Sequence, residues 1–237
     1  VEFVKILLIA FLGAHLADSR HYIGAGGLNS RALLPPMEHL GPLALMTLLF
    51  AFLLTVQRDL GAALLLFGVF VAMLYAATGY VRYALLGIAI AVAGAAGAAL
   101  LFDHVRVRFQ VWIDPWKYAD GRGYQIVESL FALGAGGLWG KGLGAGMGVR
   151  IPAVETDFIF ALITEELGLM GAAAVLFLLA ALSVRAISPL GSAEMEPAQR
   201  LVSAGIGLLF ALQSALIVGG VTRLVPVTGV TLPLVSY

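Results

Sequence analysis

The sequence contains no cysteine and few charged residues. Without cysteine, the chain cannot form a disulfide, a thiolate nucleophile or a cysteine-ligated metal site. Charged residues make up 12% of the chain and hydrophobic residues 61%, whereas soluble domains are about a quarter charged and about half apolar. So few polar side chains could not cover the surface of a globular monomer in water. The composition therefore excludes a soluble enzyme, a nucleic-acid-binding protein and a disordered protein, and it leaves an integral membrane protein with several helical spans.

Net charge and the common catalytic patterns are missing as well. The 14 basic residues balance the 14 acidic ones, so no net charge draws the chain to anionic partners. The four histidines lack metal-ligand spacing, and no Ser/His/Asp arrangement has support. The chain begins at Val1 and stops at Tyr237, just after a Pro/Gly/Thr-rich stretch. We therefore expect both ends to have been cut from a longer chain.

Long apolar runs dominate what is present. A bilayer core of about 30 Å needs roughly 20 apolar residues per helix. Six stretches meet or approach this length: Phe3–Ala17, Leu40–Val56, Leu60–Thr78, Tyr83–Phe102, Phe158–Leu182 and Leu201–Val221. Their apolar residues are continuous and do not alternate, which excludes β-barrel strands. We predict an all-α integral membrane protein, a polytopic helical bundle, with polar connections at Asp18–His39 and Ser183–Arg200.

One long polar segment, 103–157, separates two groups of spans. It carries twelve charged residues and the tryptophans of the chain, and long segments between spans tend to be functional. We predict four spans with short loops in 1–102, a large extracellular loop with the active site in 103–157, and two spans plus a Pro/Gly-rich segment in 158–237. Basic residues counted over all loops would place 103–157 in the cytoplasm, but the short loops, which the positive-inside rule weights most, place it outside.

Several charged residues lie within or beside the predicted spans, where each is by default a site candidate. Glu2 and Lys5 are three residues apart on one helix face and can pair, although a lysine snorkelling from a span edge explains Lys5 equally well. Asp59 belongs to a short connection that is either a site or a plain interfacial loop. Glu165 and Glu166 lie about two turns inside the fifth predicted span, and a structural ion pair competes with a functional role there.

Asp157 is the strongest candidate for a functional residue among the acidic side chains. It follows Thr156 at the start of the fifth predicted span, so either residue could be a plain helix N-cap. An N-cap does not account for the dense polar segment that leads into it. That segment includes the glycine-rich stretch 134–146 around Lys141, and bare glycine backbone can approach a phosphate closely. The stretch matches neither the P-loop nor the dinucleotide pattern, and a flexible surface loop explains it as well.

Several separated motifs occur together, in one order along the chain. They are Glu2-Phe-Val-Lys5, Gln57-Arg58-Asp59-Leu60-Gly61, Arg106-Val-Arg108, Asp114-Pro115-Trp116, Gly121-Arg-Gly123-Tyr124-Gln125, Ser129, Gly136-Gly137-Leu-Trp-Gly140-Lys141-Gly142, Thr156-Asp157-Phe158-Ile-Phe160-Ala, Glu165-Glu166-Leu-Gly168 and 226–237. Together they resemble the SEDS family of shape, elongation, division and sporulation proteins, which includes FtsW, RodA and SpoVE. The resemblance implies a fold of ten transmembrane helices, of which this chain would hold about six, with the large extracellular loop between the seventh and eighth.

The resemblance also implies an activity. It indicates a peptidoglycan glycosyltransferase that polymerises lipid II, a disaccharide-pentapeptide on undecaprenyl pyrophosphate, at the outer face of the bacterial cytoplasmic membrane. Asp157 corresponds to the family's essential aspartate, and we expect it to be the general base for the attacking sugar hydroxyl. Arg106, Arg108 and Lys141 would stabilise charge on the pyrophosphate, with a divalent cation, Mg²⁺ or Mn²⁺, as an optional helper. The other expected substrate-binding residues are Glu2, Lys5, Asp59, Gln125, Ser129, Thr156, Glu165 and Glu166.

Two other classes of function compete with the polymerase. The first is a transporter that flips lipid II across the membrane, which intramembrane charges would suit equally well. The polar residues gather at one face rather than at the midplane, which favours the enzyme. The second is a non-catalytic scaffold for a class B penicillin-binding protein, a partner that the resemblance implies in either case. Lipid II, this partner and the membrane are the expected contacts, and nucleic acid is not.

Overall fold

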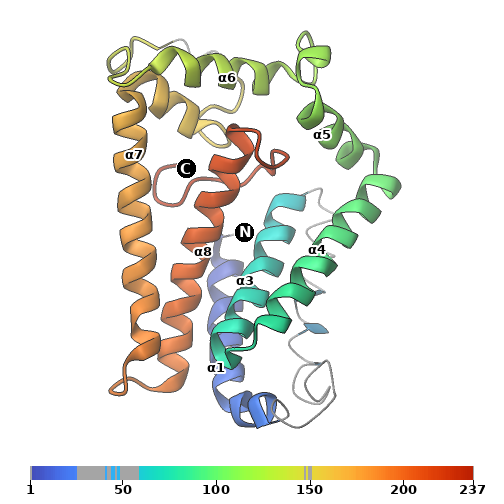
Figure 1. Ribbon diagram of the computed structural model, residues 1–237, viewed down its shortest axis with the longest axis vertical. Coiled ribbons are helices and arrows are strands. Elements are labelled where there is room, and N and C mark those ends of the chain that lie inside the picture. Colours follow the sequence, from blue (N-terminus) through green and yellow to red (C-terminus); the bar gives the residue numbers. More distant parts are fainter. Residues whose placement is uncertain are drawn as a thin grey trace. The chain divides into compact units, whose positions relative to one another are not determined.

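The computed structural model describes residues 2–25, 41, 44–45, 47–48, 59–146, 148 and 151–236. The elements in these ranges are helices: α1 (Glu2–Ala25), α3 (Leu60–Thr78), α4 (Val81–Leu101), α5 (Asp103–Ile113), the 3₁₀ turn η1 (Trp116–Tyr118), α6 (Tyr124–Gly136), α7 (Ile159–Ile187), the 3₁₀ turn η3 (Ser188–Gly191) and α8 (Pro197–Val221). Figure 1 shows their order along the chain. The prediction of an all-α protein is confirmed for the described residues.

Four of these helical segments are long and apolar enough to cross a membrane: Gly61–Thr78, Val81–Leu101, Ile159–Gly191 and Pro197–Val221. They coincide with four of the six predicted spans. The predicted span Phe3–Ala17 lies within α1, whereas most of Leu40–Val56 lies outside the described residues and stays a prediction. The chain is thus a multi-pass membrane protein.

The helix ends follow local capping chemistry where the sequence supplies it. Asp59 is the N-cap of α3, and its side chain accepts a 3.0 Å hydrogen bond from the backbone N–H of Ala62. Gly79 ends the same helix in the left-handed conformation, with φ 74°, which costs a glycine little. The sequence therefore defines α3 at both ends.

Two predicted connections were wrong in extent. The polar loop expected from Asp18 begins later, because α1 continues to Ala25. Polar residues can continue a helix as well as form a loop, so polarity alone does not mark where a helix ends. The linker expected over Ser183–Arg200 is shorter, because α7 continues to Ile187 and α8 begins at Pro197. Proline fits the first helical position, where its missing N–H leaves no hydrogen bond unmade.

The chain divides into two compact units. The first comprises Val1–Val92 and Ala181–Leu212, and α1 packs against α3 inside it. Glycines set its helix contacts, because a Cβ on Gly205 of α8 would lie 2.6 Å from Ile9 Cγ2 and 2.8 Å from Met73 Sδ. Small residues let membrane helices approach closely, so van der Waals packing stabilises this unit.

The second unit comprises Ala93–Ala180 and Gln213–Tyr237, and the polar segment 103–157 belongs to it. This segment, expected as a loop, forms α5, η1 and α6 and then a series of turns that lead to α7. The division at 102/103 and 157/158 stays a prediction, since the compact units combine residues from distant parts of the chain.

The helix α7 is broken at Gly168, whose φ of 72° and ψ of −176° are not helical. The break leaves two carbonyls, of Glu165 and Glu166, and two N–H groups, of Leu169 and Met170, without their usual helical partners. The glycine-rich stretch satisfies all four. The N–H groups of Lys141 and Gly142 donate to the two carbonyls over 2.9 and 3.0 Å, and the carbonyls of Gly137 and Leu138 accept from the two N–H groups over 2.9 and 3.2 Å.

Candidate functional site

A cavity of about 140 Å³ lies within the second unit. Three parts of the chain line it besides Asp157 and Phe158, which immediately precede α7. The lining residues are Val107, Arg108 and Val111 of α5, Arg122, Gln125 and Ile126 at the start of α6, and Val227 and Gly229 of the segment that follows α8. The cavity thus combines one carboxylate, two guanidinium groups and one amide with apolar walls. Polar groups that converge in an apolar cavity are the usual form of a binding site.

Gly229 brings the backbone close to two of the three charged groups of the cavity. Its φ is 76°, a conformation that favours glycine. A Cβ at this position would lie 3.6 Å from Asp157 Oδ2 and 3.9 Å from Arg108 Nη1. The carboxylate and the guanidinium therefore face the same bare stretch of backbone, and a side chain there would occupy part of the cavity.

The segment after α8 is tied to α5 at two points. Arg108 Nη1 donates hydrogen bonds to the carbonyls of Val227 and Thr228 over 3.2 and 3.0 Å. Trp112 Nε1 donates to the carbonyl of Arg223 over 2.9 Å, while Arg223 Nη2 donates to the carbonyls of Trp112 and Ile113 over 3.1 Å each. Arg108 therefore has a structural contact as well as a place in the cavity.

Arg223 also ends α8 in an unusual way. Its φ is 62°, and the N–H of Leu224 donates to the carbonyl of Gly219 over 2.8 Å. This bond pattern is a Schellman cap, where glycine is the common residue. A non-glycine residue in this conformation is strained and persists where its surroundings hold it. The paired bonds with Trp112 supply that restraint.

Further contacts hold the turn that precedes Asp157. Gln125 Nε2 donates to the carbonyl of Pro152 over 3.2 Å, and Ser236 Oγ donates to the carbonyl of Thr156 over 2.9 Å. The Thr156 hydroxyl donates to the carbonyl of Ala153 over 3.1 Å. Asp157 is half-buried, and α7 begins two residues later, at Ile159. Contacts from α6 and from the C-terminal segment thus fix the backbone at Asp157.

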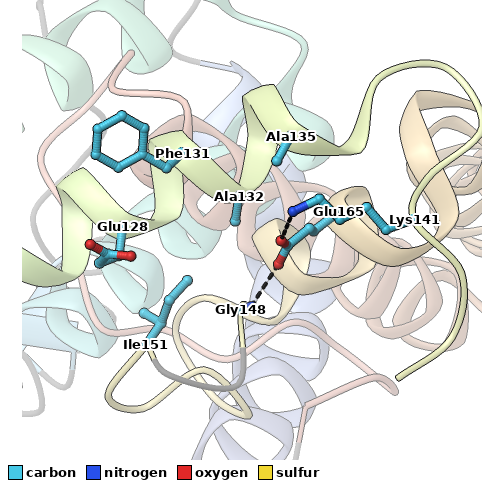
Figure 2. A pocket seen from close by; sticks show the side chains of 8 residues that line it. All are labelled: Glu128, Phe131, Ala132, Ala135, Lys141, Gly148, Ile151 and Glu165. Carbon is cyan, nitrogen blue, oxygen red and sulfur yellow. Dashed lines mark hydrogen bonds and ion pairs between the residues drawn. The ribbon is translucent and has the colours of Figure 1, made fainter. Parts of the chain in front are cut away.

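A second cavity, of about 210 Å³, lies beside the broken helix (Figure 2). Its charged groups are Glu128 of α6, Glu165 of α7 and Lys141 of the glycine-rich stretch. Lys141 Nζ lies 2.7 Å from Glu165 Oε1, and the N–H of Gly148 donates to Glu165 Oε2 over 2.6 Å. Figure 2 shows the Glu165 carboxylate between these two partners. The Glu165 side chain is 2% exposed, so the ion pair with Lys141 offsets the cost of burying its charge.

The structure divides the predicted site residues between these places. Asp157, Arg108 and Gln125 line the smaller cavity, and Lys141 and Glu165 line the larger one. Arg106 lines neither. Its guanidinium lies 3.4 Å from Asp103 and donates to the carbonyls of Ala99 and Leu100 at the end of α4.

The remaining candidates lie outside both cavities. Ser129 is fully buried and donates to the carbonyl of Ile126 over 2.8 Å. The Glu166 side chain is half-buried, whereas Lys5 is 2% exposed on α1 and Asp59 caps α3. The side chain of Glu2 lies outside the described residues.

Two residues of the smaller cavity were missed by sequence reasoning, Arg122 and Gly229. Arg122 stands inside the Gly121–Gln125 motif, so a charged residue in a motif was the available signal. Gly229 stands inside the 226–237 motif, which gave the same kind of signal. Its approach to Asp157 joins residues far apart in the chain.

The described residues do not fit a Mg²⁺ or Mn²⁺ ion held by the chain alone. These ions take several oxygen ligands, and the smaller cavity contributes one carboxylate beside two guanidinium groups. Within the described ranges, no group of three or more His, Cys, Asp or Glu side chains could hold a metal ion.

Comparison with known proteins gives one consistent result. The whole chain, residues 1–237, matches the FtsW/RodA/SpoVE family model, described as cell cycle protein. It is 40% identical over 237 residues to the peptidoglycan glycosyltransferase RodA of Mycobacterium tuberculosis H37Rv, covering 100% of this chain and 50% of RodA. It is 35% identical over 241 residues to the stage V sporulation protein E of Bacillus subtilis 168, covering 100% of this chain and 62% of that protein.

The chain also resembles a solved structure over nearly its whole length. It belongs to work described as "Structural coordination of polymerization and crosslinking by a peptidoglycan synthase complex". The TM-score is 0.70 and the sequence identity 25%, and the match covers 98% of this chain and 63% of the other. The chain spans about half the length of the RodA relatives that it matches.

Proposed function

Because the chain belongs to the family of cell cycle proteins that includes FtsW, RodA and SpoVE, we propose that the protein is a peptidoglycan glycosyltransferase that polymerises lipid II into glycan strands. Relatives named as such enzymes support the activity. The observation that carries the proposal is the cavity in which Asp157 lies with Arg108, Arg122 and Gln125.

The reaction requires a base and positive charge in one place. The 4-hydroxyl of an acceptor sugar attacks the anomeric carbon of the donor, the new C–O bond forms, and the bond from that carbon to the pyrophosphate oxygen breaks. The Asp157 carboxylate accepts the hydroxyl proton, a role that fits an aspartate in a partly apolar cavity. Arg108 and Arg122 stabilise the negative charge of the departing undecaprenyl pyrophosphate.

The cavity is suited to the reacting groups and not to the whole substrate. Ligand pockets commonly measure about 300–1,000 Å³, and this cavity measures about 140 Å³. It therefore takes the pyrophosphate and the adjoining sugar atoms, while the peptide and polyprenyl chain lie outside it. We assign the pyrophosphate charge to the two arginines.

The membrane setting and the partner belong to the same proposal. We place the protein in the bacterial cytoplasmic membrane with 103–157 outside, where undecaprenyl-linked precursors would be joined. A class B penicillin-binding protein is the proposed partner. The similar solved structure supports this choice, because it is of a synthase complex described as coordinating polymerisation with crosslinking.

The first prediction concerns Asp157. Asp157→Asn keeps the side-chain volume but cannot take up the hydroxyl proton, so polymerisation falls by about 10²–10⁴-fold. The protein in its full natural length, purified with its penicillin-binding partner, is given labelled lipid II in detergent, and the glycan products are separated on a gel. A ladder from the wild type and none from Asp157→Asn is expected.

A ladder of wild-type intensity from Asp157→Asn would remove the base role. If neither protein made a ladder, a lipid II translocation assay in liposomes would test the transporter. If the protein neither polymerised nor translocated lipid II but still bound its penicillin-binding partner, the non-catalytic scaffold would be the remaining function.

A further inference from the structure

The turns before Asp157 form a short hydrogen-bonded path that starts at Gly148. The N–H of Ile151 donates to the carbonyl of Gly148 over 2.9 Å, and the N–H of Val154 donates to the carbonyl of Ile151 over 3.2 Å. The N–H of Asp157 donates to the carbonyl of Ala153 over 3.1 Å. Ile151 and Val154 are 3% and 6% exposed, so these two side chains hold the turns by packing as well.

Glu165 connects the two ends of this path, Gly148 and Asp157. Its carboxylate accepts from the N–H of Gly148, where the turns begin, and α7 leads from Glu165 back to Asp157, where they end. The fit is close, because a Cβ on Gly146 or on Gly148 would lie 2.9 Å from Glu165 Oε2. The carboxylate therefore occupies the space that glycine leaves, and moving it releases the start of the segment.

We infer that Glu165 is a positioning residue for Asp157, which it holds in place through the N–H of Gly148. The inference rests on the proposed function. Glu165 lies in the larger cavity and Asp157 in the smaller one, so Glu165 acts on the reaction through the backbone and not by touching the reacting atoms. Lys141 Nζ contacts Glu165 Oε1, and Glu165 Oε2 accepts from the N–H of Gly148.

Two substitutions of Glu165 distinguish the effect of its side-chain length from the effect of its charge. Glu165→Gln keeps the length and an oxygen that accepts from Gly148, but it loses the charge that faces Lys141. Glu165→Asp keeps the charge but is one methylene shorter, so it cannot reach Gly148 without backbone movement. If Glu165 positions Asp157, Glu165→Gln retains at least about a third of the wild-type kcat, and Glu165→Asp loses about 10–100-fold, because small displacements of a catalytic group are costly.

The kinetic test is lipid II polymerisation by the full-length protein with its partner. We expect the loss in Glu165→Asp to fall on kcat, with KM for lipid II within about threefold of wild type. A rise in KM at unchanged kcat would mean that Glu165 contacts substrate, and it would overturn the inference. The reverse order, an active Glu165→Asp and an inactive Glu165→Gln, would also overturn it, since the charge and not the reach would then matter.

A second readout does not depend on activity. Amide hydrogen exchange of the peptide covering 148–157, followed by mass spectrometry, should be faster by about tenfold in Glu165→Asp and near wild type in Glu165→Gln. Exchange in α5 is the internal control and should not change. Unchanged exchange of 148–157 in Glu165→Asp would overturn the inference. If no variant and no wild-type protein polymerises lipid II, the proposed function fails, while the exchange result still decides whether Glu165 holds this segment.

Discussion

The basic side chains of the polar segment divide by what each one contacts. Arg108 and Arg122 lie in the cavity of Asp157. Arg106 donates to the last carbonyls of α4, and Lys141 pairs with Glu165. A basic residue whose donors are engaged by the protein has fewer left for a ligand. Arg122 is therefore the cation that the structure adds to the site, and Arg106 and Lys141 have structural contacts that the sequence could not reveal.

This division predicts a specific loss of activity. Arg122→Gln removes one of the two charges that face the pyrophosphate, and we expect the polymerisation rate to fall by about tenfold or more, since charge-assisted hydrogen bonds are worth about 1.5–3 kcal/mol. Lys117→Gln is the matched control, because Lys117 is exposed and does not line the cavity. Initial rates of lipid II consumption measure both. Equal rates for Arg122→Gln and the wild type would remove Arg122 from the site.

At the scale of the elements, the break in α7 decides where a buried charge can lie. The part from Leu169 to Ile187 rises about 28 Å at about 1.5 Å per residue, which is close to the hydrocarbon thickness of about 30 Å. The turns before the break, with Glu165, are therefore not needed to cross the hydrocarbon core. Irregular backbone in or near a membrane is tolerated where protein groups satisfy its hydrogen bonds, and 137–142 does so at all four positions. The glycines are required because a Cβ on Gly168 would meet the backbone of Leu138 and Gly140.

The break predicts a large stability difference between two glycine substitutions. Gly168→Ala introduces strain at a positive φ and a clash with backbone, so we expect a loss of about 2 kcal/mol or more. That loss corresponds to a Tm lower by about 4–8 °C. Gly134→Ala is the control, because its Cβ would meet nothing within 4 Å and alanine favours the helix α6. Thermal unfolding in detergent measures both, and an equal Tm for the two variants would contradict the role given to Gly168.

At the scale of the whole molecule, the membrane orientation is directly testable with cysteine labels, because residues 1–237 contain no cysteine of their own. One membrane-crossing segment, Ile159–Gly191, separates the polar segment from the connection between α7 and α8. Asp120 and Glu194 are exposed on these two connections. They should therefore lie on opposite sides of the membrane.

Single cysteines at these positions decide the side. We expect Asp120→Cys to react with a membrane-impermeant maleimide in intact cells, and Glu194→Cys to react only after the membrane is permeabilised. The parent protein without either substitution gives the background. Labelling of Glu194→Cys alone in intact cells would reverse the orientation and place the cavity of Asp157 on the cytoplasmic side, where the proposed polymerase would have no outward-facing site.

The sequence by itself determined the class of protein and much of its order along the membrane. Hydropathy depends only on residues that are neighbours in the sequence. Four apolar runs therefore located the helices α3, α4, α7 and α8 to within a few residues. The predicted bounds Leu60–Thr78 agree with α3, which the structure shows to be capped by Asp59 and ended by Gly79. Helix ends without such cues were misjudged, as at Ala25 and Pro197, because polar residues permit a helix as well as a loop.

Only the tertiary structure decided which charges meet. Lys141 and Glu165 are 24 residues apart, and Arg108 reaches the carbonyl of Thr228 across 120 residues. Local composition carries no signal at such separations, because these contacts depend on how the broken α7, α5 and the C-terminal segment pack. The motifs named Asp157, Arg108 and Gln125 in advance, but the same reasoning grouped Arg106 and Lys141 with them. The packing of the second unit separates these two from the cavity and adds Arg122 and Gly229 to it.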